Sequence, residues 1–392
     1  MPPSLAHRID AMRDKGSDGW EIHYKSRAMF EAGEPVLRLT VGEHDIRTDP
    51  SILAAMAASA AAGNTGYTLG PGKMALREAV AARVQARTGI DTSWRNVIVT
   101  PGGQAALFAA HMVVCNPGDR ALFCDPYYAT YPATIRAVGA SAEAVPTLPQ
   151  DAFMPQAAVL ARQAAGARSL LINSPNNPTG VVYDRATMEG IAAVVQNHGL
   201  WLISDEVYDT QVWDGVHLSP RALPDMAERT IVVGSMSKSH AMTGFRIGWV
   251  VAPEPVVDAV TLLATNTTYG LPGFIQDAAL YALQKGAGFE DMVAEPFRRR
   301  RAIAARVLAG QNAVGMIPNS GAMYLMLDIR STGLSGNAFA ERLLEAERIA
   351  VMPGESFGSA AAGHVRVAMT IADDAFEEAL VRLVRFAEEV GR

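Results

Sequence analysis

The sequence SMSKSHAMTGFRIG, from Ser235 to Gly248, joins two short apolar runs, IVVGS and IGWVV. Lys238 is its fourth residue. Runs of this length and β-branched content predict buried strands. Lys238 is therefore expected on the turn at the carboxyl end of a strand, with serines on both sides and Arg246 eight residues on. Ligands of open parallel sheets bind at that edge, so we expect the turn to carry function.

Similar apolar runs occur on the amino-terminal side of this stretch, at residues 97–100, 121–124, 169–173 and 200–204. Alanine-rich segments with helical spacing, such as residues 74–87, lie among and before them. Short, fully apolar runs that alternate with helices predict an α/β fold with a mostly parallel sheet covered on both faces.

The pattern changes after about residue 290. An arginine-rich helix comes first, and its run at 298–301 is expected to be a solvated face. Predicted strands at 323–329, 349–352 and 364–369 and a closing helix follow it. This part predicts a smaller α+β unit, which the segment before residue 45 is expected to join. We predict a large domain over 46–288 and a small domain from 1–45 and 289–392.

Composition excludes several classes of protein. The 392 residues contain 34 Lys and Arg against 40 Asp and Glu, a net charge of −6 that argues against a nucleic-acid binder. Apolar runs are too short to cross a membrane, and residues 1–10 lack a secretory pattern, so we expect a cytoplasmic protein. Two cysteines, Cys115 and Cys124, are expected to be buried thiols, and we expect no metal site.

Lys238 is one of five lysines, and its neighbours suit a covalent cofactor. A lysine that forms a Schiff base with an aldehyde needs a partly desolvated site. The hydroxyls of Ser235 and Ser237 and the fork of Arg246 suit a phosphate. An aldehyde that carries a phosphate is pyridoxal 5'-phosphate, which we predict as the cofactor.

Other strand ends supply what the ring of that cofactor needs. Asp205 follows the run at 200–204 and can pair with the pyridine nitrogen, while Tyr208 can reach the phenolic oxygen. Asn177, in the segment SPNNPTG after the run at 169–173, can donate to the same oxygen. Tyr128, with Tyr127 as a competitor, can cover the ring face.

The phosphate also needs backbone amides. Gly102, Gly103 and Gln104 follow the run at 97–100 and begin a predicted helix. Glycines permit close approach of the backbone, and a helix amino terminus favours an anion.

Together these features resemble the class I/II aminotransferases, the fold-type I pyridoxal phosphate enzymes, from about Val36 to Arg366. The resemblance implies a seven-stranded sheet in the large domain. It implies that Arg366 grips the substrate α-carboxylate, with Gly42 and Asn177 also binding substrate. It further implies that Tyr67 reaches the phosphate of a neighbouring subunit, hence a homodimer with shared active sites. Family members often have cis bonds before the prolines matching Pro126 and Pro178.

The function that follows is ping-pong transamination between an amino acid and a 2-oxo acid through a Schiff base on Lys238. Lys238 is expected to act as general base, assisted by Asp205 and Tyr208. Partners beyond these substrates and a second copy, such as nucleic acid or a membrane, are not expected.

Two alternatives stay open, and a third is discounted. A C–S β-lyase or another fold-type I enzyme would use the same cofactor, since the sequence does not report which substrate bond is aligned for cleavage. A non-catalytic cofactor-binding regulator usually carries an added DNA-binding domain, for which about 40 residues leave little room. A nucleotide-binding α/β enzyme would need a glycine-rich phosphate motif that is absent from the sequence.

The chain also departs from the family pattern. The family often has Gly-Glu-Pro-Asp where this chain has Gly42-Glu43-His44-Asp45, and we give His44 no catalytic role. In aspartate-specific relatives, a basic residue on the helix after Gln104 can hold the distal carboxylate. This chain has AAHM at 109–112, which weakens a dicarboxylate preference, so we expect broad or neutral-to-aromatic donors.

Overall fold

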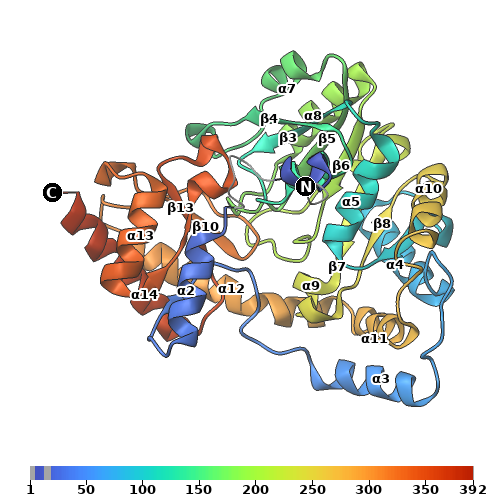
Figure 1. The fold of residues 1–392 in the computed structure, drawn as a ribbon, viewed down its shortest axis with the longest axis horizontal. Helices are drawn as coiled ribbons and strands as arrows, with labels where there is room; N and C mark the ends of the chain where they lie inside the picture. Colours follow the sequence, from blue (N-terminus) through green and yellow to red (C-terminus); the bar gives the residue numbers. More distant parts are fainter. Residues whose placement is uncertain (1–4, 13–18, 392) are drawn as a thin grey trace, which may run out of the picture.

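The computed structural model describes residues 5–12 and 19–391, and a seven-stranded sheet lies at its centre (Figure 1). The strand order is β2-β8-β7-β6-β5-β3-β4. Neighbouring strands pair in parallel except β8, which is antiparallel to both β7 and β2. The predicted α/β fold with its mostly parallel sheet is confirmed. The strands are β2 (Val97–Thr100), β3 (Arg120–Asp125), β4 (Ser141–Pro146), β5 (Ala167–Asn173), β6 (Trp201–Asp205), β7 (Thr230–Ser235) and β8 (Gly248–Val251).

Two apolar layers cover the sheet, because successive side chains of a strand point to opposite faces. On β3, Phe123 packs into one layer and Leu122 into the other. Strands that are covered on both faces, such as β2 and β8, are buried throughout for this reason. The first layer contains α5 (Gly103–Val114), α6 (Tyr131–Ala137) and α10 (Glu254–Thr265). The opposite layer contains α3 (Pro50–Ala61), α4 (Met74–Thr88), α7 (Ala157–Ala164), α8 (Arg185–His198) and α11 (Gly273–Gln284).

A smaller unit with its own core lies to one side (Figure 1). Its antiparallel sheet has the order β12-β13-β10-β9, and a parallel pair joins β1 to β11. The strands are β1 (Leu37–Arg38), β9 (Gly315–Met316), β10 (Tyr324–Asp328), β11 (Ile349–Ala350), β12 (Met352–Pro353) and β13 (His364–Ala368). The helices are α2 (Glu21–Glu31), α12 (Ala287–Leu308), α13 (Gly336–Glu347) and α14 (Asp373–Val390).

Helix α12 contributes to both cores, with Phe289 in the large unit and Phe297 in the small one. The domain division at 45/46 and 288/289 stays a prediction, and residues 1–4, 13–18 and 392 of the predicted small domain lie outside the described residues.

The solvated face predicted for the arginine run at 298–301 is wrong for one of its members. The side chain of Arg300 is 3% exposed and forms ion pairs with Asp45 and Asp373. Arg298 and Arg299 remain exposed, as predicted. Helical periodicity explains the difference, because adjacent residues of α12 point in different directions and Arg300 faces the N-terminal segment and α14.

Both cysteines are buried and free, as predicted. Cys115 follows α5 in one layer of the large unit, whereas Cys124 on β3 faces the other. Burial raises the pKa of the Cys124 thiol to about 12.

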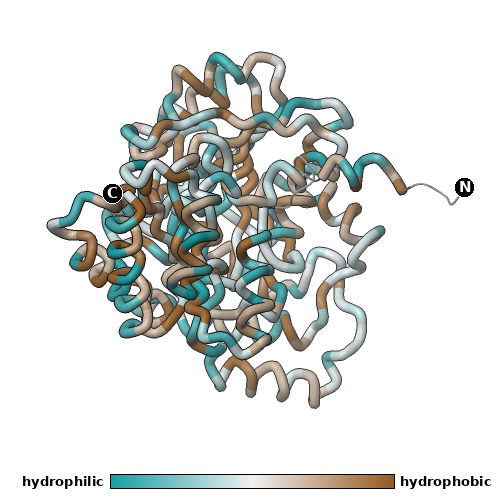
Figure 2. The backbone as a smooth tube through the Cα atoms, turned by 60° about the vertical axis from the view of Figure 1, so that its left-hand side comes forward, coloured by the Kyte–Doolittle hydropathy of each residue, from teal (hydrophilic) through white to brown (hydrophobic). Residues whose placement is uncertain are grey.

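The short helix α1 (His7–Asp10) has no buried residue, whereas hydrophobic stretches run through the middle of the molecule (Figure 2). The predicted lack of a secretory pattern at residues 1–10 rests partly on residues 1–4, outside the described part. Within the described ranges, no helix is both long and apolar enough to cross a membrane.

Candidate active site

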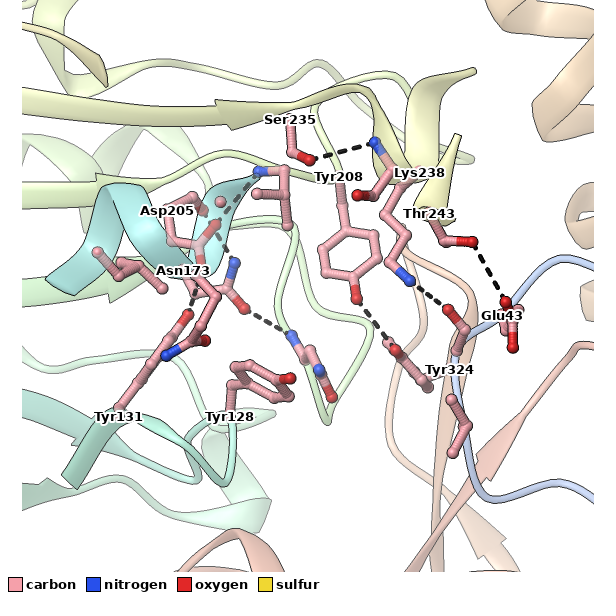
Figure 3. A pocket seen from close by; sticks show the side chains of 18 of the residues that line it. Glu43, Tyr128, Tyr131, Asn173, Asp205, Tyr208, Ser235, Lys238, Thr243 and Tyr324 are labelled. Atoms are coloured by element: carbon pink, nitrogen blue, oxygen red, sulfur yellow. Dashed lines mark hydrogen bonds between the residues drawn. The ribbon is translucent and has the colours of Figure 1, made fainter. Parts of the chain in front are cut away.

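The carboxyl ends of the parallel strands meet at one pocket of about 310 Å³ (Figure 3). Lys238 follows β7, Asp205 ends β6, Asn177 follows β5 and Tyr128 follows β3. β2 leads into Gly103 at the start of α5. Side chains from distant parts of the sequence are thus assembled because parallel strands end at the same edge of a sheet.

Lys238 lies on α9 (Met236–Ser239), a single turn that Ser235 caps. The Ser235 hydroxyl accepts a hydrogen bond from the Ser237 amide at 3.1 Å. The Lys238 ammonium donates to the carbonyl of Gly42. Burial lowers the pKa of this amine, because low-polarity surroundings disfavour the charged form. The lysine is therefore better suited to nucleophilic and basic chemistry than an exposed one.

Asp205 is a buried carboxylate at the end of β6. The Tyr131 hydroxyl donates to its Oδ2 at 2.6 Å, and the Val207 amide donates to its Oδ1 at 3.3 Å. Burial raises the pKa of Asp205 to about 6 despite these two donors. Among the described residues Asp205 forms no ion pair, so it offers a place for a cationic group in the pocket.

Arg366 on β13 is fully buried and held in one orientation. Its guanidinium lies 4.4 Å from the ring centroids of both Tyr324 and Phe357. Nη1 donates to Asn177 Oδ1 at 2.8 Å, and Nη2 donates to the carbonyl of Thr40. Nε is buried and has no partner within the described part of the chain. A planar cation that is fixed in this way suits a carboxylate ligand.

The turn between β2 and α5 packs against Arg246. Gly102 has a φ of +82°, and a Cβ there would lie 2.5 Å from Arg246 Nη2. Glycine is therefore needed both for the backbone conformation and for the space. Gly103, Gln104, Ser235, Ser237 and Arg246 all line the pocket, which combines a helix amino terminus with hydroxyls and a guanidinium. This combination suits a phosphate.

Four tyrosines of the described residues line the pocket walls, and one of them, Tyr131, is the donor to Asp205. The hydroxyls of Tyr208 and Tyr324 lie 3.0 Å apart. Burial raises the pKa of Tyr208 well above its ordinary value, so it stays a neutral donor. Tyr128 lines the pocket and packs edge-on against Tyr131, with ring centroids 5.7 Å apart.

Most of the predicted site residues line this pocket, and two do not. Gly102 lies behind the lining, against Arg246. Tyr67 is 91% exposed and lies against Tyr269 in a surface depression, away from the pocket. Gly42 takes part through its carbonyl, and a Cβ there would lie 1.9 Å from the Tyr324 hydroxyl oxygen.

Several lining residues were missed by sequence reasoning. Tyr131 stands three residues after Tyr128 in the segment PYYATY that follows β3, and this nearness in the sequence could have drawn attention to it. Asn173 ends its strand at the functional edge, which is the same signal that identified Asp205. Tyr324 lies in a strand of the small unit, and no local pattern marks it. The others are Trp20, Val41, Glu43, Leu107, Val207 and Thr243.

The peptide bonds before Pro126 and Pro178 are cis, as predicted, and the bond before Pro175 is cis as well. Within the described ranges, no cluster of three or more His, Cys, Asp or Glu side chains is arranged to hold a metal ion.

The pocket fits pyridoxal phosphate by its chemistry. The unpaired buried carboxylate of Asp205 suits a protonated ring nitrogen. The desolvated amine of Lys238 suits an aldehyde, and the turn packed on Arg246 suits a phosphate.

The fold and the pocket thus define an α/β enzyme of the amino-group-transferring type. The family profile "Aminotransferase class I and II" matches residues 34–383, and the chain belongs to this family. Members of the family use pyridoxal phosphate and act on amino acids and keto acids.

Individual relatives agree with this assignment. The arginine–pyruvate transaminase of Pseudomonas aeruginosa is 42% identical, over 96% of each chain. The aspartate/prephenate aminotransferase of Thermus thermophilus is 34% identical, over 99% of each. The solved aspartate aminotransferase from Thermus thermophilus with maleate has a TM-score of 0.92 at 33% identity, over 98% of this chain and 100% of that chain. The chain is therefore an aminotransferase, which removes the regulator and nucleotide-binding alternatives.

Proposed function

We propose that this chain binds pyridoxal phosphate at Lys238 and transfers an amino group from an amino acid to a 2-oxo acid in two successive half-reactions. The main support is the convergence of Lys238, Asp205 and Arg366 on one pocket. The surroundings of Lys238 suit amine chemistry, those of Asp205 suit pairing with a cationic ring, and those of Arg366 suit carboxylate binding.

The remaining site residues would hold the cofactor. Asp205 would pair with the ring nitrogen, Tyr208 and Asn177 would donate to the phenolic oxygen, and Tyr128 would cover the ring. The phosphate would be held by Gly102, Gly103, Gln104, Ser235, Ser237 and Arg246, with Tyr67 from a second copy of the chain.

When bound, pyridoxal phosphate supplies an aldehyde that condenses with amines and a ring that takes up the electron pair left when the α-proton departs. Lys238 Nζ removes this proton and holds it for return, since burial keeps a larger share of the amine neutral. Arg366 and the Gly42 backbone fix the α-carboxylate, so that the α-proton faces Lys238. The rings of Tyr324 and Phe357 keep water away from the guanidinium.

The Lys238→Ala variant tests this proposal. We expect turnover to fall by about a thousandfold or more, because the general base is lost. Spectra in the visible range, recorded while an amino acid and then a 2-oxo acid are added, follow both half-reactions.

Lys25→Ala is the matched control, because Lys25 forms an ion pair on the surface and should leave turnover unchanged. Near-normal turnover in Lys238→Ala would contradict the proposal. Ammonia and pyruvate released from a cysteine conjugate, without amino transfer, would favour the β-lyase alternative.

We also propose a homodimer. Tyr67 and Tyr269 are 91% and 59% exposed, with ring centroids 5.1 Å apart. Leu69 and Leu262 are exposed as well. The contact between the two exposed rings is the kind of exposed apolar cluster that is typical of a protein interface. A cytoplasmic location stays a prediction.

A further inference from the structure

One charged group of the pocket has no role in the proposed function. Five charged side chains line the pocket: Glu43, Asp205, Lys238, Arg246 and Arg366. Under the proposed function, the cofactor takes Asp205, Lys238 and Arg246, and the substrate α-carboxylate takes Arg366. The one charged group left over among these lining residues is the carboxylate of Glu43.

Glu43 lies beside the reacting centre. It follows Gly42, whose carbonyl accepts a hydrogen bond from the Lys238 ammonium. The Thr243 hydroxyl donates to Glu43 Oε1 at 3.2 Å, and both side chains stand on the same side of the pocket as Lys238 (Figure 3). Burial lowers the pKa of Lys238, and the negative charge of Glu43 acts on it in the opposite direction.

The carboxylate of Glu43 has room for a further partner. It forms no ion pair within the described part of the chain, and the residue is exposed at the pocket opening. A carboxylate has about four acceptor positions, of which a single hydroxyl occupies one. A cation that enters the pocket can therefore bind here without displacing a competing basic side chain.

The walls of the pocket suit a side chain with an apolar stem and a charged end. Val41, Leu107, Tyr128 and Tyr324 line it, as does Trp20. Aliphatic stems of basic side chains pack well on such surfaces while the charged end stays near water. Aromatic rings also attract a cation that lies over their faces.

A second substrate carboxylate has no matching group among these lining residues. Both lining cations outside the catalytic lysine, Arg246 and Arg366, are already engaged. His111, on the helix after Gln104, does not line the pocket, and burial lowers its pKa to about 4, which keeps it neutral. Glu43 would repel an approaching carboxylate.

We infer that the preferred amino donor has a cationic side chain, of the guanidinium or alkylammonium class, and that Glu43 determines this preference by pairing with the cation. This inference rests on the proposed function. It replaces the broad or neutral-to-aromatic preference expected from the sequence, because the sequence did not place Glu43 in the pocket.

The experiment compares L-arginine with L-citrulline, which has nearly the same shape but no charge, and with L-aspartate. Steady-state assays of the wild type, Glu43→Gln and the control Glu341→Gln, with a 2-oxo acid as amino acceptor, give kcat and KM for each donor. Glu341 lies on α13 and pairs with Lys25 at the surface.

We expect the wild type to prefer arginine over citrulline by at least about tenfold, the size of one charge-assisted contact. Glu43→Gln should lose this preference through a higher KM for arginine, while citrulline changes less than about twofold. Added salt should weaken arginine binding in the wild type more than in Glu43→Gln. Glu341→Gln should behave as the wild type.

Two different failures can be told apart. If Glu43→Gln weakens arginine and citrulline equally, or if the wild type prefers aspartate, the inference is wrong and the proposed function stands. If the wild type converts no amino acid at all, including the three donors, the proposed function is wrong. The inference is then wrong as well, because it rests on that function.

Discussion

At the scale of single residues, Asp205 connects stability with function. Its pKa is about 6 in the folded chain, against an ordinary value of 3.8, because the carboxylate is buried. The fold therefore favours the protonated form. As the pH rises from about 4 to above 6, the free energy of unfolding of the cofactor-free chain therefore falls by about 3 kcal/mol.

Asp205→Asn should remove this penalty. At pH 8 the cofactor-free variant should be more stable than the wild type by up to about 3 kcal/mol, and the difference should shrink toward pH 5. The amide oxygen can still accept from Tyr131. Thermal unfolding at both pH values measures the effect, with the exposed Asp258→Asn as control. Equal differences at pH 5 and pH 8 would show that the burial of Asp205 is not the cause.

The same variant should bind the cofactor more weakly. A neutral amide cannot balance a protonated ring nitrogen as a carboxylate does. Titration with pyridoxal phosphate, followed by absorbance, should give a higher Kd for Asp205→Asn than for the wild type. Unchanged affinity would show that Asp205 does not contribute to cofactor binding.

Predictability at this scale depended on whether a residue stood in a local motif. Lys238 and Asp205 were found because a chemically distinctive residue followed an apolar run. Tyr324 was missed because it reaches the pocket from the small unit, through a contact that forms between chain segments 116 residues apart. Glu43 was visible in the sequence, but its place at the pocket opening depends on the fold.

At the scale of elements, four charges form a closed ring. Arg83 and Arg87 on α4 each pair with both Asp209, which follows β6, and Glu290 on α12, at distances of 2.6 to 2.9 Å. Burial alone would raise the pKa of Asp209, but the two guanidiniums outweigh it and lower the pKa below its usual range. The ring thus ties α4 and α12 to the segment that carries Tyr208.

Arg83→Met should destabilise the protein by about 3 kcal/mol, since it leaves buried carboxylates with one guanidinium between them. Arg87→Met should cost less, because Arg87 is more exposed. Urea unfolding of both variants compares the two. Because the pKa of Asp209 is lowered, the stability that the ring contributes is present above about pH 4 and declines in acid. Equal losses in the two variants would contradict the importance of burial.

Elements with strong local patterns were predicted closely. The helix predicted at 74–87 is α4, Met74–Thr88. β4 was not predicted, because its sequence SAEAVP contains no continuous apolar run. Most of its side chains are accessible, and it lies at an edge of the sheet. At the opposite edge of the sheet β2 is buried at every position, whereas in β4 only Val145 is buried, so no continuous apolar run marks β4.

At the scale of the whole molecule, the proposed dimer would build each active site from residues of both copies of the chain. Tyr67 lies away from its own pocket, so any role at the phosphate requires a second copy. Sedimentation equilibrium should show a dimer.

Mixing two defective variants tests whether sites are shared. At limiting cofactor, the Lys238→Ala and Tyr67→Ala variants should each have low activity. In a hybrid dimer, one site carries both changes and the other carries neither, so refolding the two together should restore activity above the sum of the parts. Activity equal to that sum would place Tyr67 outside the shared site.

Chemical labelling of the two cysteines can also measure how the large unit opens. Their thiols lie in opposite apolar layers of the central sheet, so a reagent reaches each one when its own layer opens. With Cys115→Ala and Cys124→Ala, labelling rates in mild denaturant would report the two layers separately. Unequal rates would show that one side of the sheet loosens first, and equal rates that the sheet and both layers open as a single cooperative unit.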